Sequence, residues 1–564
     1  MAKRKALKIV LIVVLSIVTV VIFFVPAVAA VSMLQPAMKP IRYDPVSPDY
    51  WPTESWRMST PEEQGMDSAK LLEMVEYYQK TYSEKNTMAI DSITIVRNGY
   101  IVADMYFNPL YDEDDTHILH SVTKSVMSAL IGIAIDRGYL ESVDVRIVDI
   151  FDDEDREGRD SRWDVLTVKH LLTMQTGLHT RDSYLYGYEG LFAMQKTDDW
   201  VQYFLGRSFE EDPGTRFEYS NCASFMLSAV IQRCTGMDTL QFAQENLFGP
   251  LGIDDVQWEK SPGGISIGWA RMWLKPGDMA KLGLLYLQKG NWDGRQILPV
   301  QWIDDTLTAH SLPKKYRKVY DENGKWDLLM SGGDFMNTYF NRPFSDGYGY
   351  QIWLDKAGRY SAVGTGGQYI MIAPSENMIV VFTAKLSGTD AFFPETLFER
   401  YILASLVADH PIQADEFAQK KLLALRTPPQ LSASPEPVPA LPGIASEISG
   451  KTYSLEKNNW DYDNFRLDFE SGTDTAQFGY TAKMSDVVSY MIGLDGIPRL
   501  TDTNNAIYAA RGYWETPDTF VIHVEIIGYS TRDEWRLTFD GGDLQVEEIG
   551  VTGTYRYGGT MKQE

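Results

Sequence analysis

The chain has 564 residues, 44% hydrophobic and 23% charged, which is typical of globular proteins but too long for one ordinary core. Its formal net charge of −25 excludes nucleic acid as an expected partner, because phosphate binding requires clustered cations, and it disfavours broad adsorption to anionic lipid. The two cysteines, Cys222 and Cys234, are too few for a disulfide framework.

Residues 1–38 read as a signal or anchor segment. Four cationic residues within the first eight precede a charge-free run that begins at Ile9. Pro26 is followed by Ala27-Val28-Ala29, which has the small-x-small form of a signal-peptidase site. Cleavage would release a secreted enzyme, whereas an uncleaved apolar run of about 20 residues would span a bilayer as an anchor. Either outcome predicts an extracytoplasmic protein, attached to the membrane by an N-terminal helix or secreted.

Residues 39–425 read as a mixed domain of helices and strands. The spacing of apolar residues predicts a helix over 68–82, and Asn98-Gly99 between two alternating runs predicts a hairpin. A helix should run from Ser121 to Gly138. Strand-like runs return at 349–354, 360–363, 369–373 and 378–384. Strands at both ends with helices between them predict a central antiparallel sheet, assembled from distant segments and flanked by helices.

The remaining residues divide into a linker and a second domain. Residues 426–443 contain six prolines, which predicts a semi-extended, exposed linker. Beyond it, residues 444–564 show repeated period-2 alternation, as in Phe465, Leu467 and Phe469. This pattern predicts an all-β barrel or sandwich, and it leaves open whether the domain serves packing or binding.

Ser121-Val122-Thr123-Lys124 heads the predicted helix that ends at Gly138. Three residues are nearly one helical turn, so Ser121 and Lys124 share a face. A serine hydroxyl is a poor nucleophile until a neighbouring group accepts its proton, and a lysine can do so if burial or a nearby cation lowers its pKa. On the tetrapeptide alone, a capping serine with a solvated lysine is the favoured interpretation, since serine is a preferred cap.

Two later motifs favour catalysis. They are Tyr219-Ser220-Asn221 and the glycine-rich element 364–368, Gly-Thr-Gly-Gly-Gln, which precedes a strand-like run. Ser-x-x-Lys, Tyr-x-Asn and a glycine-rich element in this order resemble the serine β-lactamase and penicillin-binding-protein group, in particular class C-like enzymes with their esterase and 6-aminohexanoate-oligomer hydrolase relatives. The resemblance runs from about residue 50 to about residue 410. It implies a β-lactamase/transpeptidase-like α/β (α+β) fold.

The resemblance also implies residue roles. Ser121 would be the nucleophile of an acyl-enzyme, and Lys124 and Tyr219 would be the candidate bases. Asn221 would hydrogen-bond Lys124 and the substrate amide. The oxyanion hole would combine the Ser121 amide with an amide of the element Gly366-Gly367-Gln368, with Gln368 preferred over Gly367. The expected substrate is a small molecule or peptide with an ester or amide bond, and neither a cofactor nor a metal is expected.

The third motif departs from the lactam-active pattern. Those enzymes usually carry a lysine at its head, where this chain has Gly364 or Thr365. The lysine helps to hold the substrate carboxylate, and a charge-assisted contact of this kind contributes about 1.5–3 kcal/mol. Hydrolysis of an ester or amide is therefore expected above efficient β-lactam turnover. Two alternatives stay open: a cell-wall D,D-peptidase or β-lactamase, and a non-catalytic sensor or binding protein.

Overall fold

The computed structural model describes residues 38–83, 90–152, 160–182, 188–313, 343–430, 434–458, 461–482, 485–503, 506–529, 532–550 and 553–562. The chain divides into two units, Met1–Pro40 and Ile41–Glu564. The predicted signal or anchor segment lies outside the described residues, except for Met38. Among the residues that are described, no helix combines the length and the apolar character needed to cross a bilayer.

A seven-stranded antiparallel sheet forms the centre of the first domain, and it confirms the prediction of a sheet built from distant segments. β1 pairs with β12, so that Ile93 lies opposite Phe382. In spatial order the strands are β2 (Tyr100–Tyr106), β1 (Ile90–Arg97), β12 (Met378–Ala384), β11 (Gln368–Ala373), β10 (Tyr360–Gly364), β9 (Trp353–Leu354) and β8 (Gly347–Tyr348).

Two local predictions can be compared with this sheet. The Asn98-Gly99 hairpin is confirmed: both residues have positive φ, +52° and +85°, as a type I′ turn between twisted strands requires. The strand predicted over 349–354 is confirmed only at Trp353–Leu354, which form β9, because 349–352 form the turn between β8 and β9. Gln351 in this turn has φ +57° and bonds two other segments, so tertiary contacts override the local pattern.

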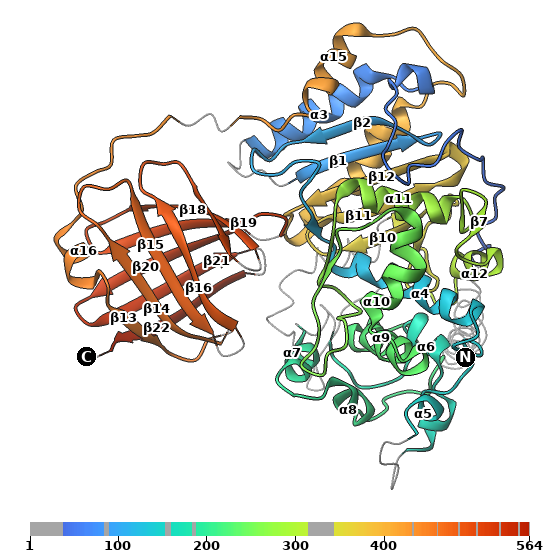
Figure 1. The fold of residues 1–564 in the computed structure, drawn as a ribbon, viewed down its shortest axis with the longest axis horizontal. Helices are drawn as coiled ribbons and strands as arrows, with labels where there is room; N and C mark the ends of the chain where they lie inside the picture. Colours follow the sequence, from blue (N-terminus) through green and yellow to red (C-terminus); the bar gives the residue numbers. More distant parts are fainter. Residues whose placement is uncertain are drawn as a thin grey trace, which may run out of the picture. The chain divides into compact units, whose positions relative to one another are not determined.

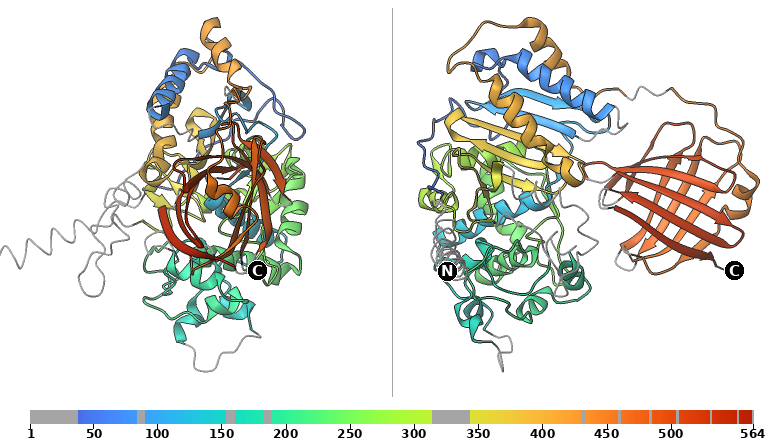
Figure 2. Two further views of the ribbon diagram at one scale, coloured as in Figure 1. Left: turned by 90° about the vertical axis from the view of Figure 1, so that its left-hand side faces the viewer. Right: turned by 180° about the vertical axis from the view of Figure 1, so that it is seen from behind.

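Helices cover both faces of the sheet (Figures 1 and 2). On one face lies α3 (Ser68–Ser83), whose Leu71, Met74 and Tyr78 join the buried cluster that includes Phe382. Full burial of one such side chain contributes about 1.5–3 kcal/mol to the free energy of folding. On the other face lies α11 (Pro276–Leu287), where Gly283 approaches β12 so closely that an added Cβ would stand 2.6 Å from Ile379 Cγ2.

Along the sequence, a mainly helical region separates β1 and β2 from β8–β12. Its centre is the packed pair α4 (Thr123–Asp136) and α9 (Asn221–Thr235). The predicted end of α4 is confirmed, since Gly138 has φ +75° just beyond it. The other helices here are α5 (Ile147–Ile150), α6 (Val168–Leu172), α7 (Glu189–Gln195), α8 (Trp200–Leu205), α10 (Thr239–Ala243) and α12 (Val300–Thr306).

Two small sheets complete the domain. β3 (His117–Ile118), β5 (Met272–Leu274) and β4 (Gln257–Trp258) form one sheet in this order, and β6 (Asn291–Trp292) pairs with β7 (Arg295–Gln296). α14 (Phe393–Leu397) and α15 (Glu416–Ala424) follow the last strand. β3 ends three residues before Ser121, so it fixes where the Ser-x-x-Lys segment begins.

The C-terminal domain is a barrel. Nine strands close through one parallel pair between β16 and β18, and β17 (Arg499–Thr503) extends from β18. The nine are β13 (Thr452–Leu455), β14 (Tyr462–Phe469), β15 (Thr475–Ala482), β16 (Ser485–Gly493), β18 (Ala506–Trp514), β19 (Thr519–Ile526), β20 (Arg532–Asp540), β21 (Asp543–Gly550) and β22 (Gly553–Met561). Phe465, Leu467 and Ile522 are buried in its core, which confirms the period-2 alternation.

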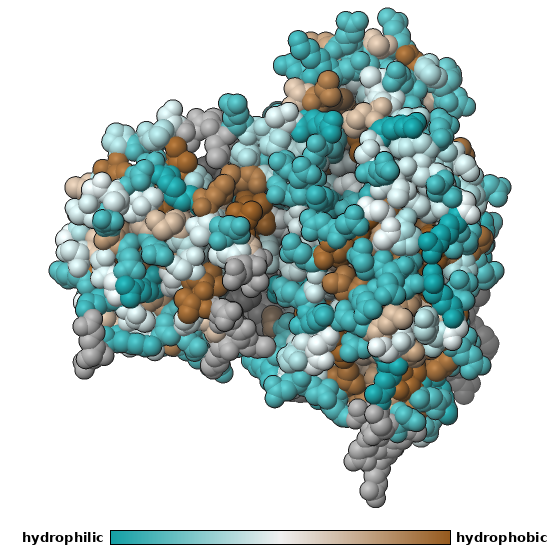
Figure 3. Space-filling model, in the orientation of Figure 1, coloured by the Kyte–Doolittle hydropathy of each residue, from teal (hydrophilic) through white to brown (hydrophobic). Residues whose placement is uncertain are grey.

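The proline-rich segment ends on this barrel. Val438 and Leu441 pack against the barrel core, and the Glu436 amide donates to the Asp495 carbonyl. α16 (Gly443–Ile448) follows directly. The second half of the predicted linker is therefore seated on the domain that it precedes. On the face drawn in Figure 3, hydrophilic residues predominate among the coloured atoms and the hydrophobic ones form small groups, in keeping with the net charge of −25.

Candidate active site

Ser121 lies at a sharp change of backbone direction. It sits in the short turn η3 (His120–Val122), between β3 and the first residue of α4. His120 has φ +45°, a left-handed conformation that is uncommon for a residue with a side chain. Strain of this kind costs about 1–3 kcal/mol and must be held by surrounding contacts. Ser121 itself is half-buried, so its hydroxyl keeps access to a substrate.

Lys124 is buried beneath Ser121 and has three oxygen neighbours. Its Nζ lies 2.8 Å from Asn221 Oδ1, 3.0 Å from the Trp269 carbonyl and 3.1 Å from Ser121 Oγ. Only 1% of the surface of Lys124 is exposed to solvent. Burial lowers the pKa of Lys124 to about 7, although Asp182 and Cys222 act in the opposite direction. The amine can therefore be neutral at ordinary pH.

The Tyr-Ser-Asn motif lies at the start of α9. The Lys124 Nζ is 4.8 Å from the centroid of the Tyr219 ring, which stacks on Trp353. Ser220 caps α9 by accepting from the Ala223 amide, the arrangement that favours serine at this position. The structure thus brings Ser121, Lys124, Tyr219 and Asn221 together, as the motif order predicts.

Asp182 holds this motif in place, and sequence reasoning missed it. Its Oδ2 accepts from the Ser220 hydroxyl at 3.0 Å and also from the Cys222 amide, while its carbonyl accepts from Asn221 Nδ2 at 2.6 Å. The Asn221 amide group is therefore fixed with Oδ1 toward Lys124. Asp182 stands about forty residues before the motif and belongs to no recognised pattern, so no sequence signal identified it.

Gln351 is a second residue that the sequence did not reveal. Its Nε2 donates to the carbonyls of Leu171 and Leu172, and its Oε1 accepts from Ser224 in α9. Its own carbonyl accepts from Ser125 in α4. One buried glutamine thereby ties α4, α6 and α9 to each other, and it bonds α4 at the residue that follows Lys124.

The glycine-rich element is the turn between β10 and β11, and it lies against η3. An added Cβ on Gly364 would stand 2.3 Å from the Leu119 carbonyl, so a lysine cannot occupy this position unless the backbone moves. Gly366 and Gly367 have φ +84° and +91°. The Gln368 side chain bonds both backbone groups of Ala384, which assigns it to holding the turn on β12. The oxyanion role of the Gly367 or Gln368 amide stays a prediction.

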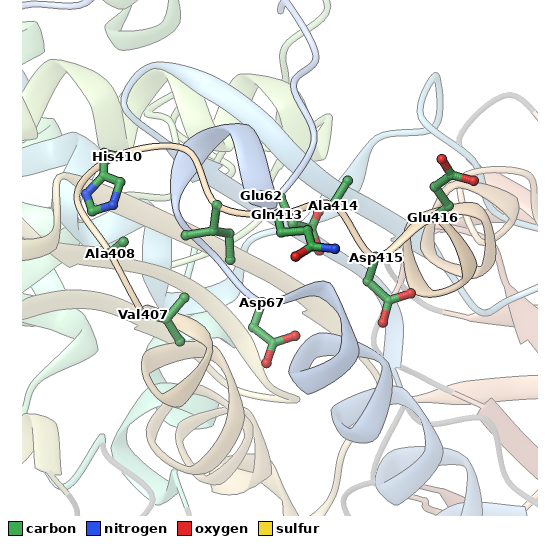
Figure 4. A pocket seen from close by; sticks show the side chains of 10 residues that line it. Glu62, Asp67, Val407, Ala408, His410, Gln413, Ala414, Asp415 and Glu416 are labelled. Carbon is green, nitrogen blue, oxygen red and sulfur yellow. The ribbon is translucent and has the colours of Figure 1, made fainter.

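A large surface hollow lies among Glu62, Asp67 and the segment 407–416. It has a volume of about 770 Å³ and is open to solvent, and carboxylates line it (Figure 4). Asp67 and Asp415 cap α3 and α15, and Glu62 bonds Ser68 and Gln419. These acids have structural partners, and the hollow shares no lining residue with the Ser121 cluster. We assign it no chemistry.

Comparisons with known proteins agree with the arrangement of the motifs. The family model described as Beta-lactamase matches residues 80–402, more than half of the chain. The 6-aminohexanoate-dimer hydrolase of Paenarthrobacter ureafaciens is 21% identical over 305 residues, covering 52% of this chain and 71% of that protein. The monacolin J acid methylbutanoyltransferase of Aspergillus terreus is 28% identical over 159 residues, covering 25% and 37%.

Among solved structures, the octameric penicillin-binding protein homologue from Pyrococcus abyssi has a TM-score of 0.43 at 15% identity, covering 86% of this chain and 99% of that one. The family match spans β1, Ser121, Lys124, Tyr219 and the glycine-rich turn. This chain, a serine hydrolase acting on ester or amide bonds, therefore belongs to the beta-lactamase family.

Proposed function

We propose that this protein cleaves an ester or amide bond through an acyl-enzyme on Ser121. The arrangement around Lys124 carries the proposal. Two of its three oxygen neighbours, Asn221 Oδ1 and the Trp269 carbonyl, can only accept hydrogen bonds. A neutral amine has two N–H groups and one lone pair. If the two N–H groups serve these acceptors, the lone pair is left for the Ser121 hydroxyl 3.1 Å away.

In the acylation step, Ser121 Oγ attacks the substrate carbonyl carbon while its proton passes to Lys124 Nζ. The oxyanion that forms accepts from the Ser121 amide and from an amide of the glycine-rich turn. When the bond to the leaving group breaks, the proton on Lys124 passes to the leaving oxygen or nitrogen. The product of this step is an ester of Ser121, with Lys124 neutral again.

Water then attacks the acyl-enzyme, and the same groups act in reverse. The water gives a proton to Lys124, or to Tyr219 when that side chain is a phenolate, and the Tyr219 ring lies beside the Lys124 amine. The released Ser121 oxygen recovers a proton, and the acid product leaves. Asn221 is positioned to bond the substrate amide as well as Lys124, because Asp182 fixes its orientation.

Two reagents separate the proposed function from its alternatives. A fluorophosphonate probe should label Ser121, whereas a labelled penicillin should label it weakly. The reason is that neither Gly364 nor Thr365 supplies the carboxylate-binding cation at the head of the third motif, and Gly364 has no room for one. In the same way, kcat/KM should be at least about tenfold higher for p-nitrophenyl butyrate than for a chromogenic cephalosporin.

The contrary outcomes are equally informative. Strong labelling by both reagents, with cephalosporin turnover above ester turnover, would support the cell-wall peptidase or β-lactamase. Labelling by neither reagent would support a non-catalytic sensor. A denatured sample serves as the control for non-specific reaction with the fluorophosphonate.

We also propose that the enzyme acts outside the cytoplasm. The support is the cationic start followed by an apolar run and the Ala27-Val28-Ala29 sequence. Fusion of residues 1–60 to an alkaline phosphatase that is active only outside the cytoplasm should give an active reporter. A control fusion that begins at residue 39 should give none. An inactive 1–60 fusion would contradict this location.

A further inference from the structure

The turn between β19 and β20 of the barrel is bonded to the strand that leads into Ser121. The Gly528 carbonyl accepts from the Ile118 amide at 2.6 Å, and Ile118 is the last residue of β3. Gly528 has φ +73°, and an added Cβ would stand 2.1 Å from the Thr116 carbonyl. The contact therefore requires glycine, both for its backbone conformation and for its close approach.

The same turn touches the strand beside β3. The Tyr529 ring packs on Trp273 in β5, with ring centroids 5.2 Å apart. Ile118 lies opposite Trp273 in the β3–β5 pair. β5 is preceded by Trp269, whose carbonyl is one of the partners of the Lys124 amine. One barrel turn thus rests on both segments that place the reacting pair.

A buried charge cluster anchors the base of this turn. Glu525, the residue before the last of β19, pairs with Lys385, and Lys385 also pairs with Asp91 at 2.9 Å. The side chains of Lys385 and Asp91 are 3% and 2% exposed. Asn108 donates to both carboxylates, and Asp91 is also bonded by His117 in β3. A buried charge network holds its elements together only when all its members are paired.

Lys385 also stands at the glycine-rich turn. The residue before it, Ala384, is bonded by the Gln368 side chain, and the Leu386 amide after it donates to the Gly366 carbonyl at 2.9 Å. The barrel therefore reaches the segments that lead to Ser121, to Lys124 and to the third motif.

We propose that the β19–β20 turn is a built-in part of the active site, which positions the Ser121 segment and the glycine-rich turn for acyl transfer. This inference rests on the hydrolysis proposed at Ser121. It goes beyond that proposal in making a barrel turn, distant in the sequence from every motif, a requirement for full turnover. Gly528 and Glu525 are positioning residues in this scheme, because neither bonds Ser121 or Lys124.

The test compares two glycine variants of the full chain. Gly528→Ala should lift the turn from Thr116 and lower kcat at least tenfold, with KM changed less than twofold. Gly472→Ala is the matched control, since Gly472 has φ +82° in another barrel turn with nothing within 4 Å of an added Cβ. It should keep the wild-type kcat. Each kcat is normalised to the sites that the fluorophosphonate probe titrates, so that unfolded protein does not count.

Glu525→Gln provides a second route that does not strain the backbone. It should lower kcat by about tenfold, whereas Glu547→Gln, which removes a surface pair with Arg556, should leave it unchanged. Wild-type kcat in both Gly528→Ala and Glu525→Gln would overturn the proposal. So would an equal loss in the Gly472→Ala control.

Hydrogen exchange separates this inference from the proposed function. Gly528→Ala should speed amide exchange at least tenfold in the peptide that contains Ile118 and Ser121, and Gly472→Ala should not. If the wild type neither labels nor hydrolyses, the proposed function fails, and exchange alone then decides whether the turn positions this segment. Unchanged exchange in Gly528→Ala would overturn the inference whatever the activity.

Discussion

Replacing Ser121 by alanine should abolish hydrolysis of activated esters, with kcat/KM falling by at least about 10⁴-fold, because the proposed nucleophile of the acyl-enzyme is lost. The same variant should stop labelling by the fluorophosphonate probe. Thermal stability should change little: the lost hydroxyl makes one hydrogen bond, to Lys124, and such a bond contributes about 1 kcal/mol. Steady-state kinetics and a melting curve check the two expectations.

Ser125→Ala is the matched control for this experiment. It removes a hydroxyl from the next turn of α4, where the hydroxyl donates to the Gln351 carbonyl at 2.8 Å. It should lower stability by about 1 kcal/mol and leave probe labelling intact. If Ser121→Ala kept more than a few per cent of the wild-type rate, Ser121 would not be the nucleophile.

Replacing Lys124 by methionine should lower kcat/KM by about 10²–10⁴-fold, since the proton acceptor is lost. Methionine is unbranched and adaptable, so it can fill the buried space. Lys281→Met is a matched control: Lys281 is a buried lysine of α11 that pairs with Asp278. It should leave kcat intact. A larger loss in Tyr219→Phe than in Lys124→Met would transfer the role of base to Tyr219.

The dependence of the rate on pH tests the role of Lys124 independently. Burial lowers the pKa of Lys124 to about 7, and only the neutral amine can accept the serine proton. The rate should therefore rise with pH through about 7 and reach a plateau above it. Lys124→Met should lose this rise. A wild-type profile that is flat between pH 6 and 8, or a rise that persists in Lys124→Met, would contradict the assignment.

The sequence by itself determined the elements whose signals are local. The Asn98-Gly99 turn demanded positive φ at both positions, and Gly138 ended α4 where a left-handed residue was needed. Ser121 and Lys124 could be paired because one helical turn brings them together whatever surrounds them. The barrel strands were visible because alternation depends only on which face of a strand is buried.

Only the tertiary structure decided what surrounds that pair. Asp182 bonds the Tyr-Ser-Asn motif from about 40 residues away, and the Trp269 carbonyl bonds Lys124 from 145 residues away. Gln351 bonds Ser125, the residue after Lys124, from 226 residues away, and no periodicity links residues so far apart. Glu525 lies 140 residues from Lys385.

The third motif is another case in which the sequence alone could not show the packing around a residue. The sequence showed only that the head of the third motif, Gly364 or Thr365, lacks a cation, whereas the structure shows that the Leu119 carbonyl lies too close to Gly364 for any side chain there. The identity of the nucleophile could therefore be predicted from residues close together in the sequence. The geometry of the site depends on close packing between distant segments, which only the folded chain brings together.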